Sequence, residues 1–133
     1  CYMMARVVVP HMQAAGRGTI VNVSSIAGIN GKGSSIAYAT SKGALNTMTL
    51  SLARSLAPEI RVNAVCPGMV DTRWHRQLLA PDAFDKLRDN SERNTPLRHV
   101  VQAEDVARAI LWMIEGAEYT TGEILQVDSG AHL

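Results

Sequence analysis

The sequence predicts an α/β fold in which helices flank a parallel sheet. Its 133 residues and mass of 14.4 kDa fit one domain, and a content of 47% apolar and 19% charged residues is enough for a buried core. Short β-branched runs alternate along the chain with longer segments of helical period. This alternation is typical of strands that right-handed helical crossovers join into a parallel sheet.

The first predicted elements are a helix and a strand. Residues 2–14 are predicted to be helical, although Pro10 lacks a backbone donor and is expected to kink or end the helix. Residues 19–24 (TIVNVS) are short, β-branched and bounded by Gly and Ser, which indicates a buried strand. We expect residues 25–36, which contain several glycines, to form a loop.

A second helix and a second strand follow. Residues 38–56 contain no proline, and Ala44, Met48 and Leu52 recur every four residues, as on the buried stripe of a helix. Residues 60–65 (IRVNAV) then have the β-branched pattern of a strand.

The C-terminal part of the chain supplies the last helix and strand. Glu104 and Asp105 place negative charge in the first turn of a helix that is predicted to run to about Ile114. Residues 123–128 (EILQVD) are predicted to form the last strand. Residues 72–97 fit neither period, and we expect a mobile flap there.

Composition excludes several classes of function. Thirteen Lys and Arg balance twelve Asp and Glu, and no basic stripe exists, so no nucleic-acid partner is expected. The apolar N-terminal segment is shorter than the ~20 residues of a spanning helix, so no membrane span is expected. Two distant cysteines and four scattered histidines predict neither a disulfide framework nor a metal site. We therefore expect a cytoplasmic protein.

The chain starts with Cys1, in what reads as the middle of an apolar segment. No helix start signal precedes it. We expect an N-terminal truncation.

The candidate chemistry lies where the predicted strands end. Ligands of open α/β sheets bind beyond the carboxyl ends of the strands, which places Ser25, Pro67 and Gly68 on one functional edge. Tyr38 and Lys42 are four residues apart and share one face of a helix. An ammonium beside a phenol stabilises the phenolate, which suits Tyr38 to general acid/base catalysis. Alternatively, the pair is a packed ring beside a solvated charge, and the Ser25 hydroxyl only satisfies the backbone at the strand end.

Four segments resemble the short-chain dehydrogenase/reductase family. They occur in the family's order as NVSSIAG, YATSK, RVNAVCPGMVDT and TTGEILQVDSG. The resemblance covers essentially residues 1–133 and implies only the C-terminal portion of a single dinucleotide-binding, Rossmann-like oxidoreductase domain. It also implies a substrate lid at about residues 72–97. Family members often carry a proline in the first helix, so Pro10 becomes a weaker objection.

The resemblance implies an NAD(P)-dependent oxidoreductase that interconverts a carbonyl and a secondary alcohol by hydride transfer. By this resemblance, Tyr38 is the catalytic acid/base, and Lys42 assists its ionisation and binds the nicotinamide ribose. The family's serine-to-tyrosine spacing selects Ser25 over Ser24 as the residue that positions the substrate oxygen.

The same resemblance assigns cofactor and substrate contacts beyond the catalytic residues. Pro67, Gly68 and Val70 would line the nicotinamide, and Thr72 would bond its carboxamide. Trp74 would contact the substrate as part of the lid; Trp74, Leu78 and Phe84 could alternatively belong to the core.

Parts of the family pattern have no counterpart in this sequence, and they leave alternatives open. The glycine-rich dinucleotide turn, the NNAG segment and the relay asparagine are absent, so adenine and pyrophosphate would bind mostly outside this chain, and NAD and NADP are not distinguished. One alternative is a truncated, catalytically inactive fragment that acts only in oligomer association, because family members commonly form homodimers or homotetramers through the equivalents of helices 2–14 and 38–56. Another is a 3-oxoacyl-acyl-carrier-protein reductase.

Overall fold

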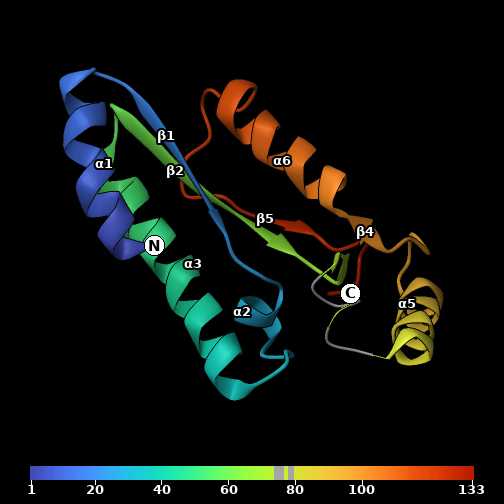
Figure 1. Cartoon of the computed structure of the whole chain (residues 1–133). Coiled ribbons are helices and arrows are strands. Elements are labelled where there is room, and N and C mark those ends of the chain that lie inside the picture. Colours follow the sequence, from blue (N-terminus) through green and yellow to red (C-terminus); the bar gives the residue numbers. More distant parts are fainter. Residues whose placement is uncertain (74–76, 78–79) are drawn as a thin grey trace.

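A three-stranded parallel sheet forms the centre of the protein in a computed structural model that describes all residues except 74–76 and 78–79 (Figure 1). Its strands are β1 (Gly18–Val23), β2 (Ile60–Pro67) and β5 (Ile124–Val127), in the order β1-β2-β5. Gly18 pairs with Ile60 and Ala64 pairs with Ile124, both in parallel register. The predicted parallel α/β fold is therefore confirmed.

Helices cover both faces of this sheet (Figure 1). α1 (Tyr2–Ala14) and α3 (Ile36–Leu56) lie on one face, where Ile60 and Val62 of β2 form a buried cluster with Ala53 of α3. α6 (Ala103–Glu115) lies on the other face. Its cluster consists of four buried residues, Val65, Val101, Val106 and Met113. Successive residues of a strand point to opposite faces, so Ile60 and Val62 of β2 pack toward α3, whereas Val65 packs toward α6.

The structure adds small elements that the sequence pattern did not indicate. A short helix, α2 (Ala27–Asn30), lies within the predicted loop 25–36. Two-residue strands, β3 (Val70–Asp71) and β4 (Val101–Gln102), pair in parallel as a second sheet.

Residues 72–97 contain more regular structure than predicted. The helix α5 (Pro81–Asn94) occupies much of this segment, and Phe84 within it is only 2% exposed. Proline at the start of α5 and Asp82 in its first turn are helix start signals, but few of the helix residues are apolar, and charged residues separate them. The predictions for Trp74 and Leu78 lie outside the described residues.

The predicted boundaries need small corrections. α1 continues through Pro10 to Ala14, so the expected break does not occur. α3 begins two residues before the predicted start, because Ser35 caps it. β2 includes Pro67, whose carbonyl accepts a hydrogen bond from the backbone N–H of Ile26 at 3.1 Å.

Within the described residues, no helix combines the length and the apolar character that crossing a membrane requires.

Candidate active site

The first turns of α3 position Tyr38 and Lys42. The Ser35 hydroxyl accepts a hydrogen bond from the backbone N–H of Tyr38 at 3.1 Å and so fixes the start of the helix. One turn later, the Lys42 ammonium lies 5.7 Å from the centroid of the Tyr38 ring. The Tyr38 side chain is accessible, because the residue is 38% exposed. The predicted pair therefore exists, with its phenol open to a ligand.

The end of β1 binds Lys42 at two points. The Lys42 ammonium donates a hydrogen bond to the carbonyl oxygen of Val23 at 3.0 Å. The hydroxyl of Ser24 donates to the carbonyl oxygen of Lys42 itself at 3.2 Å. Sheet and helix are thus joined directly beside the tyrosine.

Ser25 begins the turn that leads into α2. It is buried, and its hydroxyl oxygen accepts a hydrogen bond from the backbone N–H of Ala27 at 3.2 Å. Because the oxygen is the acceptor in this bond, the Ser25 hydroxyl hydrogen remains available to a substrate oxygen.

The Pro67–Gly68 turn adjoins the same edge. The Gly68 N–H donates to the carbonyl oxygen of Val127 at 3.0 Å and so extends the pairing of β2 with β5. A Cβ atom at position 68 would lie 2.8 Å from the Cβ atom of Asp128. This contact leaves no room for a side chain and explains the glycine.

One cavity of about 430 Å³ joins these elements. All the predicted site residues in the described part of the chain line it: Ser25, Tyr38, Lys42, Pro67, Gly68, Val70 and Thr72. Trp74, the remaining predicted contact, lies outside the described residues. Eight further lining residues were not predicted as site residues: Val23, Ser24, Ile26, Ala27, Lys32, Gly33, Ser34 and Met69. Their closeness in sequence to Ser25, Tyr38 or Gly68 was the available signal.

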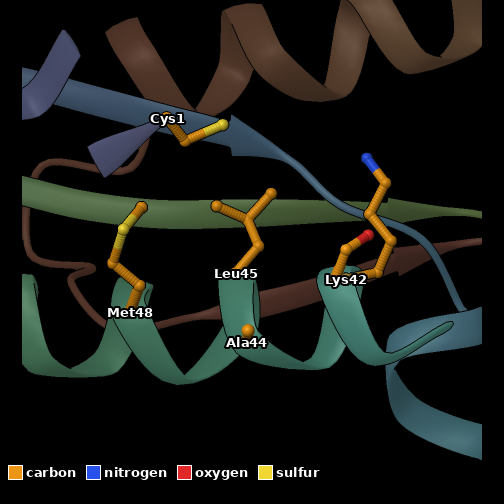
Figure 2. Close-up of a pocket in the computed structure, with 6 residues that line it drawn as sticks. Cys1, Lys42, Ala44, Leu45 and Met48 are labelled. Carbon is orange, nitrogen blue, oxygen red and sulfur yellow. The ribbon is translucent and has the colours of Figure 1, made fainter. Parts of the chain in front are cut away.

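A second cavity lies on the other side of Lys42, between the start of α1 and α3 (Figure 2). It measures about 330 Å³, and Figure 2 shows Leu45 and Met48 pointing from α3 toward the side on which Cys1 lies. Its lining is mostly apolar apart from Lys42 and Ser41. Of these two cavities, the first, with Ser25 and Tyr38, has the groups that proton transfer requires.

Cys66 lies behind the site as an inert buried thiol. Burial raises its pKa above the ordinary value, against the opposing effects of hydrogen bonds to Ser24, Ser25 and Asn46 and of the Lys42 charge. The thiol contacts the side-chain oxygen of Asn46 at 3.6 Å. A thiol held protonated is a poor nucleophile, so Cys66 is a structural residue.

The cavity fits the nicotinamide end of a dinucleotide. Pro67, Gly68, Met69 and Val70 form a largely apolar wall that could lie against a flat ring. Lys42 and Tyr38 supply donors of the kind that bind ribose hydroxyls.

Comparison with known proteins supports the assignment of the fold. The family model described as Enoyl-(Acyl carrier protein) reductase matches residues 1–132. The Streptomyces violaceoruber protein named "Granaticin polyketide synthase putative ketoacyl reductase 2" is 46% identical over 124 residues, which cover 93% of this chain and 48% of that protein. The Bacillus subtilis short-chain dehydrogenase/reductase homolog YusR is 44% identical, with 99% of this chain and 97% of the relative covered.

Solved structures agree with these relatives. Aldohexose dehydrogenase from Thermoplasma acidophilum has a TM-score of 0.91 at 30% identity, over 98% of this chain and 54% of that one. The structure described as ElxO with NADP bound has a TM-score of 0.87 at 31% identity, over 98% and 53%. The chain thus spans about half the length of these structures and of the Streptomyces relative.

Fold and comparisons together define a protein with the Rossmann-like parallel α/β fold of these solved structures. The chain belongs to the short-chain dehydrogenase/reductase family.

Proposed function

We propose that this chain is the C-terminal portion of an NAD(P)-dependent oxidoreductase that interconverts a carbonyl and a secondary alcohol. The observation that carries the proposal is the single cavity in which Ser25, Tyr38 and Lys42 meet the apolar Pro67–Gly68 turn. The relatives named as reductases and dehydrogenases support the same reaction class.

A nicotinamide held by Lys42 and the Pro67–Gly68 wall would supply the hydride chemistry of the proposed reaction, with the carbonyl carbon as the acceptor in the reducing direction. The Tyr38 hydroxyl gives its proton to the carbonyl oxygen, so that an alcohol and an oxidised cofactor result. Ser25 donates a hydrogen bond to the same oxygen and orients it. The Lys42 ammonium, 5.7 Å from the Tyr38 ring centroid, stabilises the negative charge that remains on the phenolate.

The cofactor would bind with its nicotinamide half in the cavity. Lys42 would hold the ribose, Val70 would belong to the wall beside the ring, and Thr72 would bond the carboxamide. We extend the proposal to a small-molecule substrate, to Trp74 and the segment 72–97 as a substrate lid, and to a cytoplasmic homodimer or homotetramer. NAD and NADP remain equal candidates.

The test is a Tyr38→Phe substitution in the native polypeptide that contains this sequence. We expect turnover to fall by about 10²–10⁴-fold, because the variant lacks the proton donor but keeps the ring. Tyr119→Phe is the matched control, because Tyr119 is 95% exposed and lies away from the cavity. Turnover of Tyr38→Phe equal to that of the control would contradict the mechanism.

A noncatalytic role in oligomer association is the second candidate. It is favoured by the exposed apolar residues Met3, Met4 and Val7 on α1. Titration with NADH and NADPH separates the two functions, because an association module binds neither cofactor and an oxidoreductase binds at least one. The intact mass of the native protein should be determined first, since a mass near twice 14.4 kDa would include a further half with room for the rest of the dinucleotide site.

A 3-oxoacyl-acyl-carrier-protein reductase is a narrower form of the main proposal. The Thermotoga maritima protein named as such a reductase, FabG, is 36% identical over 131 residues. Comparison of turnover on 3-oxoacyl thioesters and on simple ketones would distinguish the two substrate classes.

A further inference from the structure

We propose that Ser24 is a positioning residue, which holds Lys42 at the place where its ammonium can serve both the cofactor and Tyr38. The proposal rests on the proposed function and concerns the serine next to the predicted catalytic Ser25. It assigns the two adjacent hydroxyls to different tasks: Ser25 acts on the substrate, and Ser24 acts on the protein backbone.

Ser24 itself is held firmly. It is only 4% exposed, and its backbone N–H donates to the carbonyl oxygen of Val65 at 2.8 Å, which continues the pairing of β1 with β2. From this fixed point its hydroxyl reaches the Lys42 carbonyl at 3.2 Å, across 18 positions of sequence. The hydrogen bond therefore transmits the position of the sheet to one peptide of α3.

A close backbone contact reinforces this bond. A Cβ atom on Gly28 would lie 2.5 Å from the carbonyl carbon of Lys42 and 2.7 Å from the nitrogen of Gly43. The backbones of α2 and α3 therefore meet at the same peptide that Ser24 binds, and any side chain at position 28 would push them apart.

Lys42 is consequently fixed at both ends. Ser24 and Gly28 hold its peptide, and Val23 accepts a hydrogen bond from its ammonium at 3.0 Å. A long lysine side chain is flexible on its own, so its precise placement requires such anchors. If the peptide shifts, the ammonium moves relative to the cavity, and the contact with the ribose weakens first.

The Ser24→Ala variant tests this assignment in the native polypeptide. We expect the KM for the nicotinamide cofactor to rise about tenfold, which corresponds to a loss of about 1.4 kcal/mol of binding free energy. The KM for the carbonyl substrate should stay unchanged. Ser25→Ala should give the opposite pattern, a fall in kcat without a comparable change in the KM for the cofactor.

Ser55→Ala is the matched control. The Ser55 hydroxyl also donates to a backbone carbonyl of α3, that of Ser51, at 2.9 Å, but it lies on an exposed part of the helix away from the cavity. We expect wild-type kinetics for this variant. Ser24→Thr, which keeps the hydroxyl, should restore most of the cofactor affinity that Ser24→Ala loses.

Two glycine variants give an independent measurement. Gly28→Ala should raise the KM for the cofactor more than Ser24→Ala, because it inserts a methyl group between two backbones. Gly43→Ala is its control, because a Cβ atom there would make an ordinary contact of 3.5 Å with the Gly28 carbonyl. If Gly28→Ala does not fold, the Ser24 variants decide the question.

The outcomes separate this proposal from the proposed function. An inactive Tyr38→Phe enzyme together with an unchanged cofactor KM in Ser24→Ala would overturn the positioning role alone. A Ser24→Ala variant with fewer active molecules but unchanged KM values would also overturn it, because the role of Ser24 would then be only structural. An active Tyr38→Phe enzyme would instead refute the proposed function.

Discussion

At each end of the sheet a cationic side chain donates hydrogen bonds to backbone carbonyls, but the two side chains differ in how many donors remain for a ligand. At the amino end, Arg61 of β2 donates to the carbonyl oxygens of Met113 and Ile114 at 2.9 and 3.0 Å and to the Thr19 hydroxyl at 3.0 Å. Both terminal nitrogens of the guanidinium are thereby engaged in joining α6 to the sheet. Its five N–H donors suit such a structural role.

At the carboxyl end, Lys42 donates fewer hydrogen bonds to the protein. Within the described part of the chain, its ammonium donates one protein hydrogen bond, to the Val23 carbonyl, while the residue lines the 430 Å³ cavity. An ammonium has three donors, so capacity remains for a ligand. The comparison shows that a cation with a ligand-binding role can be recognised by N–H donors that have no partner within the protein.

Of the two cations, the one at the cavity is expected to give the larger effect when it is removed. Lys42→Met keeps the length of the side chain and loses the charge, so kcat/KM should fall about 10²–10³-fold, equivalent to about 3–4 kcal/mol. Lys86→Met, at an exposed residue that forms an ion pair with Asp82, is the control. The loss is measured as kcat/KM for the cofactor, in steady-state kinetics with a saturating carbonyl substrate. Equal kcat/KM values for the Lys42→Met and Lys86→Met variants would show that the Lys42 charge has no functional role.

Arg61→Met should reduce the stability of the protein and leave ligand binding unchanged. Because the carbonyls of Met113 and Ile114 lose their partner, we expect the free energy of unfolding to fall by about 2–3 kcal/mol. The KM values of the remaining folded enzyme should not change. Urea unfolding compared with the exposed Arg17→Met control measures the loss, and equal stabilities would show that the guanidinium contacts contribute nothing.

A smaller, pH-dependent effect is expected at the start of α6, away from either cation. The backbone N–H of Gln102 donates to the Asp105 carboxylate at 2.8 Å, and this bond, followed by those from His99 and Arg108, lowers the pKa of Asp105. A depressed carboxyl pKa stabilises the fold above the unfolded pKa of about 3.9, and the benefit disappears as pH falls through the folded value.

The stability difference between the wild type and Asp105→Asn should therefore be full at pH 7 and shrink steadily below about pH 4. Thermal unfolding across that range checks the sign. A difference that stays constant down to pH 2 would show that the Asp105 charge does not matter.

Sequence patterns predicted the parts of the molecule that repeat a regular period. The three strands of the main sheet and the helices α1, α3 and α6 each carry several apolar residues at strand or helix spacing, and the YATSK motif located Tyr38 and Lys42. Strands of two residues, such as β3 and β4, are too short to have a period, and the few apolar residues of α5 stand among many charged ones.

Contacts between distant segments were beyond prediction for a different reason. The hydrogen bond from Ser24 to Lys42 depends on how α3 packs on the sheet. The hydrogen bonds of Arg61 depend in the same way on the packing of α6. Neither residue has a local pattern that sets it apart from a solvated hydroxyl or a surface charge.

The most direct test of the central claim is to follow the hydride itself. The native polypeptide would be supplied with NADH or NADPH deuterated at the transferable position and with a panel of 3-oxoacyl thioesters and cyclic ketones. The account predicts that deuterium appears at the carbinol carbon of an alcohol product, and that Tyr38→Phe lowers its rate of formation by at least about 10²-fold. Deuterium transfer at the same rate in wild type and Tyr38→Phe, or transfer to none of these carbonyls, would contradict it.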